Sequence, residues 1–256
     1  MVVPLFHREF GGEGHPPLVV LHGMLGSSRN WQAAGRDLAA RYRVFAPDLR
    51  NHGGSPHSDE MTFEAMVGDV LAWMDSHALE RVALLGHSMG GKVAMALACR
   101  HPERVQRLIL VDIAPKDYFW PGRRREFAAM NALDLGNLRL RAQAERSFEA
   151  GVPDPAMRRF LATNLERTDG GGWKWVINLP VLTAALPVLE KTPLGPGDRY
   201  TGPTLVISGA RSAYVKPEDG ASIAAHFPDS RLVVIESAGH NPHAEARERF
   251  VQAVLE

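Results

Sequence analysis

The chain is poor in cysteine: its 256 residues include only one, Cys99. A single cysteine excludes an internal disulfide framework, and Cys99 is interpreted as a small buried side chain in a helix. The sequence also lacks an apolar run of about 18 residues, which a membrane-spanning helix needs. The N-terminus has no cationic segment followed by an apolar one, so no secretory signal is visible. We therefore expect a cytoplasmic protein without a membrane span.

The chain also has no excess of positive or negative charge, since 29 lysines and arginines balance 29 aspartates and glutamates. This balance gives no indication that a nucleic acid or an anionic membrane is a partner. Charged residues make up 23% of the chain and hydrophobic residues 45%, as in ordinary globular enzymes. The length is sufficient for one large core.

The segment at residues 82–97 carries the most informative motif. It reads as a short apolar strand, a turn between Gly86 and Gly90, and a helix of small and apolar residues. The turn matches the pattern G-x-S-x-G, with Ser88 at its centre. A sharp strand-to-helix turn exposes the serine hydroxyl, and the glycines remove side chains that would collide across it. We predict that Ser88 is a nucleophile and that the backbone N–H of Met89 faces a developing oxyanion.

Apolar strands alternate with amphipathic helices through much of the chain. Strands are predicted at residues 2–10, 18–21, 43–47, 82–85, 108–111, 204–207 and 231–235. Helices are predicted at residues 30–40, 61–77 and 217–226, after the turn at Ser88, and at the C-terminus, with Thr62 as an N-cap. This alternation predicts an α/β fold with a doubly wound, mostly parallel sheet.

Strand patterns are absent between residue 116 and about residue 200. Arginines appear there among helical patterns, interrupted by clusters of proline and glycine. We predict an all-helical cap at residues 116–200, inserted into a core formed by residues 1–115 and 201–256. The arginines are interpreted as a solvated face, and a clamp for an anionic substrate is the alternative.

Three motifs together give the chain a resemblance to a known family. They are His22-Gly23-Met24-Leu25-Gly26-Ser27, Gly-His-Ser-Met-Gly-Gly-Lys at residues 86–92, and Val111-Asp112-Ile113-Ala114-Pro115. The chain resembles the α/β-hydrolases, and within them a branch of YbfF-type esterases and ABHD11-like hydrolases. The resemblance covers nearly the whole chain and is weakest in the middle third. It implies that the N–H of Met24 is a second oxyanion donor and that His22 braces this loop.

The resemblance also implies the identity of the general base. Residues 239–243 read Gly-His-Asn-Pro-His, which is similar to the family pattern Gly-His-x-x-His. The first histidine of that pattern is the base and the second braces the start of a helix. His240 is therefore the expected base, and His243 is the competing candidate.

The acid departs from the usual family pattern. Many relatives carry it as Gly-x-x-Asp after the strand that corresponds to residues 204–207, but Ser212 occupies that position here. A serine does not stabilise an imidazolium as a carboxylate does. Asp112 follows the next strand after the turn at Ser88, at the carboxyl edge where open α/β sheets build their sites. We predict Asp112 as the acid, with Glu218 and Asp219 in the 212–219 loop as alternatives.

A substrate pocket is expected near the turn at Ser88 and under the cap. Its candidate lining residues are Leu25, His87, Phe119, Trp120, Trp173, Trp175 and Tyr214. Aromatic residues at these spacings are equally compatible with the core of the cap. In the loop after residue 47, Asp48 and Arg50 are interpreted as residues that order the loop, and Asn51 as a turn residue with positive φ. His52 and His57 are interpreted as solvated.

These residues predict a serine carboxylic-ester hydrolase that acts through an acyl-enzyme on small or short-to-medium acyl esters. No metal and no organic cofactor is required. A thioesterase, an amidase and a hydrolase of carbon–carbon bonds would use the same residues and stay open as alternatives. From a different class, a non-catalytic protein that binds a small molecule on the hydrolase scaffold also stays open. Ser88 excludes haloalkane dehalogenases and epoxide hydrolases, which use an aspartate nucleophile.

Overall fold

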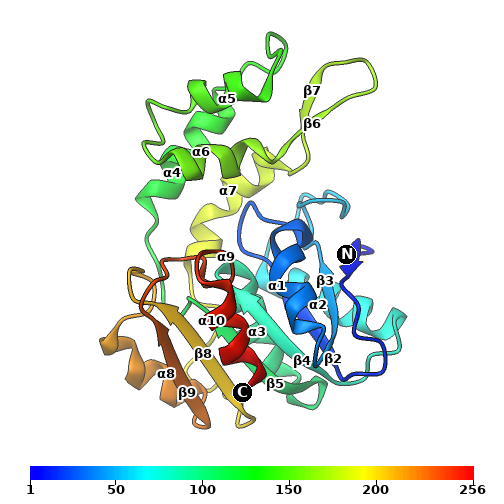
Figure 1. The fold of residues 1–256 in the computed structure, drawn as a ribbon, viewed down its shortest axis with the longest axis vertical. Helices are drawn as coiled ribbons and strands as arrows, with labels where there is room; N and C mark the ends of the chain where they lie inside the picture. Colours follow the sequence, from blue (N-terminus) through cyan, green and yellow to red (C-terminus); the bar gives the residue numbers. More distant parts are fainter.

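The computed structural model describes every residue from Met1 to Glu256. Its largest feature is a seven-stranded sheet in the order β1-β3-β2-β4-β5-β8-β9 (Figure 1). The strands are β1 (His7–Glu9), β2 (Pro17–Leu21), β3 (Arg43–Pro47), β4 (Val82–His87), β5 (Val105–Val111), β8 (Thr204–Gly209) and β9 (Ser230–Ile235). Strand β1 pairs antiparallel with β3 at one edge, and every other pairing is parallel.

Helices cover both faces of the sheet. Leu18 and Val20 of β2 belong to an apolar cluster with α1 (Gln32–Leu38) and α10 (Arg247–Leu255). Val19 and Leu21 belong to a second cluster with α2 (Phe63–Ser76), α3 (Met89–Arg100) and α8 (Gly220–His226). Successive strand residues point to opposite faces, so a strand that is apolar throughout needs helices on both sides. The predicted doubly wound, mostly parallel α/β sheet is confirmed.

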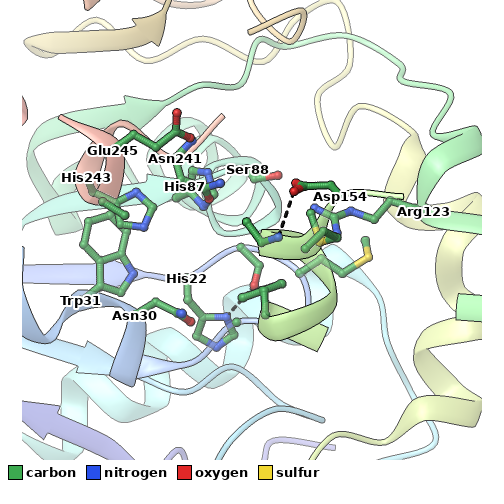
Figure 2. Close-up of a pocket in the computed structure, with 17 residues that line it drawn as sticks. His22, Asn30, Trp31, His87, Ser88, Arg123, Asp154, Asn241, His243 and Glu245 are labelled. Carbon is green, nitrogen blue, oxygen red and sulfur yellow. Dashed lines mark hydrogen bonds between the residues drawn. The ribbon is translucent and has the colours of Figure 1, made fainter. Parts of the chain in front are cut away.

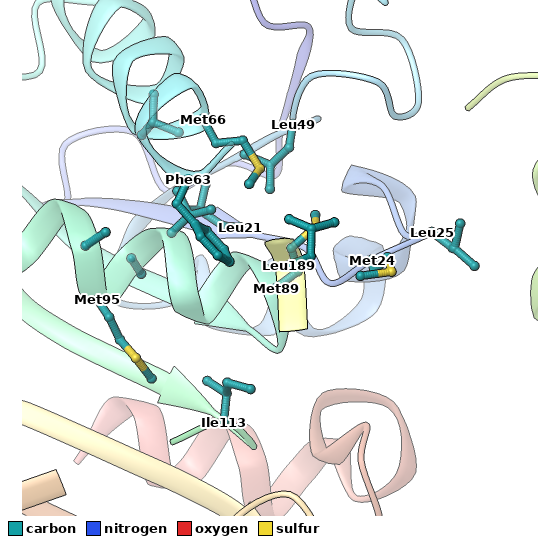
Figure 3. Packing of buried hydrophobic residues seen from close by; sticks show 14 of the residues in the cluster. Leu21, Met24, Leu25, Leu49, Phe63, Met66, Met89, Met95, Ile113 and Leu189 are labelled. Atoms are coloured by element: carbon teal, nitrogen blue, oxygen red, sulfur yellow. The ribbon is translucent and has the colours of Figure 1, made fainter. Parts of the chain in front are cut away.

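The larger cluster extends from the sheet into the segment between β5 and β8. Figure 3 shows Met89 and Met95 of α3 together with Phe63 and Met66 of α2. Leu189, which comes from the inserted segment, belongs to the same cluster. The core of the sheet and the insertion are thus one continuous apolar interior. Cys99, predicted to be buried, is only half-buried at the end of α3.

The predicted elements are correct in kind, and their bounds differ by a few residues. The edge strand β1 is shorter than expected, because only residues 7–9 pair with β3. Thr62 caps α2 as predicted, with its hydroxyl accepting from the N–H of Ala65 at 3.2 Å. No helix of the protein is long and apolar enough to cross a membrane.

The insertion between β5 and β8 is not all-helical, so that part of the prediction is wrong. It contains the helices α4 (Pro121–Asn131), α5 (Arg141–Ser147), α6 (Pro155–Ala162) and α7 (Leu179–Glu190), and an antiparallel hairpin of β6 (Leu165–Arg167) and β7 (Trp173–Trp175). The glycines at 170–172 form the hairpin turn, where Gly171 has a φ of 77°. Strands of three residues are too short to show an alternating pattern in the sequence. The insertion lies over the carboxyl ends of the parallel strands (Figure 1).

A buried lysine joins the insertion to the helix after Ser88. The ammonium of Lys92 on α3 donates to the backbone carbonyls of residues 189, 190 and 191, at 2.9, 2.9 and 2.7 Å. These carbonyls end α7, where a helix leaves its last acceptors unpaired and carries partial negative charge. Burial lowers the pKa of Lys92 to about 7. The side chain of Lys92, in the first turn of α3, thereby provides hydrogen bonds to the last carbonyls of α7.

Candidate active site

The turn after β4 places Ser88 in a strained backbone conformation. Its φ is 52° and its ψ is −117°, in a region that residues with side chains rarely adopt. A Cβ on Gly86 would collide with the backbone of Gly90, and one on Gly90 would collide with the carbonyl of His22. The glycines of the motif are therefore required by the close approach of β2, β4 and α3. This turn displays the hydroxyl at the carboxyl edge of the sheet.

Ser88, His240 and Asp112 form one line of hydrogen bonds. The Ser88 Oγ lies 3.1 Å from Nε2 of His240, and Nδ1 of His240 lies 2.7 Å from Oδ2 of Asp112. With the proton on Nδ1, the imidazole donates to the carboxylate and leaves Nε2 free to accept from the serine hydroxyl. Ser88 follows β4, His240 comes after β9, and Asp112 follows β5. The carboxyl ends of these parallel strands lie at one edge of the sheet, which brings the three residues together.

Asp112 is fully buried and is held by several donors. It accepts from the Ser208 hydroxyl at 3.1 Å and from the Gly209 N–H at 3.3 Å, and the Ser212 hydroxyl donates to its Oδ2. Its φ is 50°, which makes it a second strained residue beside Ser88. Ser212 therefore lies at the acid, although it does not supply the carboxylate.

The alternative acids are engaged elsewhere. Asp219 pairs with Lys116 at 2.6 Å, and Glu218 is exposed beside Lys216 at 3.8 Å. Neither residue contacts His240, whose only carboxylate partner is Asp112.

The loop that carries His240 is fixed on both sides of the histidine. The Glu245 carboxylate accepts from the N–H of Gly239 at 2.7 Å and from that of Asn241 at 3.0 Å. Nε2 of His87 donates to the His240 carbonyl at 2.8 Å. The imidazole itself stacks on the Tyr214 ring, with the ring centroids 3.7 Å apart and an angle of 19° between the planes.

His243 lies in the short helix α9 (Pro242–Glu245) and stacks on Trp31 at 4.2 Å. It forms no hydrogen bond with Ser88 or Asp112, and burial, with a smaller effect of His240, lowers its pKa to about 3. Its Nδ1 is buried without a hydrogen-bond partner, and its role as a brace stays a prediction.

Two backbone N–H groups near Ser88 have no hydrogen-bond partner within the chain. They belong to Met24, in the loop after β2, and to Met89, the first residue of α3. Both residues are buried, and an unpaired N–H in such a position is available to a negatively charged oxygen. The first turn of α3 adds its partial positive charge.

Histidines brace the loop that carries Met24. His22 donates from Nδ1 to the Gly23 carbonyl at 2.8 Å, and its Nε2 accepts from the Leu49 N–H at 2.9 Å. The prediction that His22 braces this loop agrees with these bonds. His52 is fully buried, and its Nε2 accepts from the Leu25 N–H at 3.2 Å. The interpretation of His52 as solvated is therefore wrong, because its imidazole accepts from the N–H of the buried Leu25.

The loop after β3 is ordered by the residues predicted to do so. The Asp48 carboxylate accepts from the N–H groups of Ser28 at 2.5 Å and Gly54 at 2.8 Å. Arg50 is fully buried and forms a bidentate pair with Asp69 at 2.6 and 2.9 Å. Asn51 has a φ of 66°, as predicted. His57 is exposed, as predicted.

A cavity of about 460 Å³ opens above Ser88 (Figure 2). The core lines it with His22, Met24, Trp31, His87 and His243, among other residues. The insertion contributes Arg123 from α4 and Ala156, Met157 and Phe160 from α6. The cavity therefore lies between the insertion and the carboxyl edge of the sheet.

Most of the predicted pocket residues do not line this cavity. Of those residues only His87 does, while Leu25 faces a second cavity. The Phe119 side chain is 72% exposed, and Trp120 is buried beside Tyr118 with ring centroids 5.7 Å apart.

The remaining predicted aromatic residues also lie outside the cavity. Trp173 and Trp175 are on β7 and pack within the insertion. Tyr214 contacts the imidazole of His240 and not the cavity. The prediction failed because Trp173 and Trp175 pack within the insertion, while Tyr214, in the loop after β8, stacks on the imidazole of His240.

Sequence reasoning missed the residues of α6. Met157 and Phe160 are three positions apart and share one face of the helix, and Asp154 caps its first turn. The apolar face of this helix could be recognised in the sequence. The sequence does not indicate, however, that this face lies opposite Ser88. Arg123 belongs to the arginine cluster interpreted as solvated, yet it lines the cavity and pairs with Glu126 at 2.6 Å.

The electrostatics of the site favour a neutral imidazole. Burial lowers the pKa of His240, the Asp112 carboxylate acts in the opposite direction, and the Arg123 guanidinium lowers the pKa further. The net shift is downward from the usual value of 6.5. His240 is thus poised to accept a proton at neutral pH.

Comparison with known proteins gives the family. A family model described as alpha/beta hydrolase fold matches residues 16–246. The chain belongs to the α/β-hydrolase family. The predicted family and fold are confirmed, and so is the prediction that the protein is an esterase-type hydrolase.

Two curated relatives and one solved structure show how far the similarity extends. The mouse protein named sn-1-specific diacylglycerol lipase ABHD11 is 35% identical, over 98% of this chain and 84% of its own length. Esterase YbfF of Escherichia coli is 34% identical, over 93% of this chain and 91% of its own length. A solved structure described as a marine microorganism esterase is 35% identical and superposes with a TM-score of 0.95, covering 99% of this chain and 98% of that one.

The lowered pKa of His240 gives a prediction for the pH dependence of this hydrolase. A general base must be neutral, so kcat/KM should rise with pH to a plateau, with the acid limb centred below pH 6.5. Replacing Arg123 by Gln removes a nearby positive charge and should move this midpoint to higher pH. The check is the pH profile of kcat/KM for Arg123→Gln against Arg125→Gln, an exposed arginine on the same helix. Identical profiles for the two variants would contradict the electrostatic role of Arg123.

Proposed function

We propose that the protein is a serine carboxylic-ester hydrolase in which Ser88 is the nucleophile, His240 the base and Asp112 the acid. The observation that carries this proposal is the line of hydrogen bonds Ser88–His240–Asp112, whose serine lines a cavity. The unpaired N–H groups of Met24 and Met89 support it, because they offer two donors to a carbonyl oxygen that becomes negative.

The acylation step follows from the geometry. His240 Nε2 takes the proton of the Ser88 hydroxyl while Oγ attacks the acyl carbonyl carbon. Asp112 stabilises the imidazolium that forms, and it fixes the tautomer through Nδ1. The tetrahedral oxyanion receives the N–H groups of Met24 and Met89. His240 then donates its proton to the leaving alkoxide, and an acyl-enzyme on Ser88 remains.

Deacylation repeats the sequence with water. His240 removes a proton from the water molecule as it attacks the acyl carbon, and it returns the proton to Ser88 Oγ as the acid leaves. Each proton is passed between Nε2 and an oxygen within its reach. The step requires no group beyond the residues of the site and water.

The insertion, proposed to span residues 116–200, acts as a cap on a core of residues 1–115 and 201–256. Met157 and Phe160 of α6 provide apolar surface opposite Ser88, which excludes water and receives an acyl chain. A cavity of about 460 Å³ suits small or short-to-medium acyl groups. The names of the relatives, esterase and diacylglycerol lipase, agree with an ester as the substrate class.

Turnover of short p-nitrophenyl esters tests the function. The wild-type protein should hydrolyse them, and Ser88→Ala should lower kcat by about 10⁴–10⁶-fold, because the nucleophile is removed while the cavity is kept. A series graded by acyl length measures the depth of the pocket. A wild-type protein without turnover on any ester or thioester of the series would support the binding-protein alternative and contradict the proposal.

The identity of the acid is tested by comparing Asp112→Asn with Ser212→Ala. Asp112→Asn removes the charge that stabilises the imidazolium and should lower kcat by about 10³–10⁴-fold. Ser212→Ala removes one hydrogen bond to the acid, and the expected loss is roughly tenfold or less. Near-full kcat in Asp112→Asn would show that the acid is elsewhere.

A further inference from the structure

A second cavity of about 460 Å³ lies between the core and the insertion, apart from Ser88, His240 and Asp112. The core contributes Arg8 of β1 and Arg29 of the loop after β2, and the insertion contributes Arg141 at the start of α5. Asn30 lines this cavity and also the one above Ser88, so the two cavities adjoin there. The second cavity has no part in the mechanism described above.

The three arginines of this cavity have no carboxylate partner. None of them forms an ion pair, and Nε of Arg8 is buried without any hydrogen-bond acceptor. Arg141 donates one bond, to the Leu165 carbonyl at 2.8 Å. A guanidinium has five N–H donors in a planar fork, so most of the donors at this cavity have no partner within the protein. Those of Arg29 and Arg141, which are exposed, are open to solvent.

The acidic residues at the cavity are already satisfied. Asp48 uses both carboxylate oxygens on the backbone N–H groups of Ser28 and Gly54. Glu166 pairs with Lys174 at 3.4 Å. The three arginines outnumber the two carboxylates, so the residues that line the cavity carry a net positive charge.

We propose that this cavity binds a phosphate group. Three guanidiniums from three separate segments match an anion with three or more acceptor oxygens and more than one negative charge. A carboxylate has two oxygens and one charge, and a single arginine would be enough for it. The volume is within the range of small-ligand sites. The phosphate belongs either to a phosphorylated ester that extends past Asn30 toward Ser88 or to a separate phosphorylated molecule.

Calorimetric titration with inorganic phosphate and with phenyl phosphate, at low ionic strength, tests the site. Each of Arg8→Ala, Arg29→Ala and Arg141→Ala should weaken binding by about tenfold or more, because each removes a charge-assisted contact. Arg36→Ala is the matched control, since Arg36 is exposed on α1, forms no ion pair and lies outside the cavity. Arg29 is exposed as well, so its variant is expected to fold even where Arg8→Ala does not.

The titration does not depend on the proposed hydrolytic function, and repeating it with Ser88→Ala protein separates the two proposals. Absence of phosphate binding by the wild-type protein, or an equal loss in Arg36→Ala, would overturn the site. The source of the phosphate is decided by kinetics on p-nitrophenyl butyrate and on a short acyl ester of glycerol 3-phosphate. If the phosphate belongs to the substrate, Arg29→Ala raises KM for the phosphorylated ester alone. If it belongs to a separate molecule, neither KM changes while phosphate binding is still weakened.

Discussion

The hydrogen bond between Nδ1 of His240 and the buried carboxylate of Asp112 orients the site, and much of the fold serves to hold its two ends. Asp112 ends β5 with a positive φ and is held by Ser208, Gly209 and Ser212 from β8 and the loop after it. The His240 loop after β9 is fixed by Glu245 and His87. Because parallel strands end at one edge, residues far apart in sequence meet there without a long loop.

The insertion depends on the same edge. The side chain of Lys92, in the first turn of α3, donates to the last backbone carbonyls of α7. Glu190, at that helix end, pairs with Arg124 and accepts from the Trp120 N–H at 2.7 Å. The helix that presents the nucleophile is therefore tied to both ends of the insertion.

The sheet and the residues near Ser88 and Asp112 were predictable from the sequence because their signals are local. The glycines around Ser88 and an aspartate after a strand are local signals, whereas the choice of His240 over His243 came from the resemblance to the family. The pocket was not predictable in this way, since Met157 and Phe160 reach it only through the packing of the insertion on the core. The burial of His52 has the same origin, because it depends on the packing against Leu25 in another loop. The β6–β7 hairpin was missed because its strands are too short for a pattern.

The central claim is that catalysis passes through a covalent intermediate on Ser88. Peptide mass spectrometry after reaction with an organophosphonate tests it most directly, because the reagent traps a serine that a neighbouring base has activated. We predict one adduct, on the peptide that contains Ser88, formed much more slowly in Asp112→Asn protein. Absence of an adduct, or an adduct on another residue, would contradict the account.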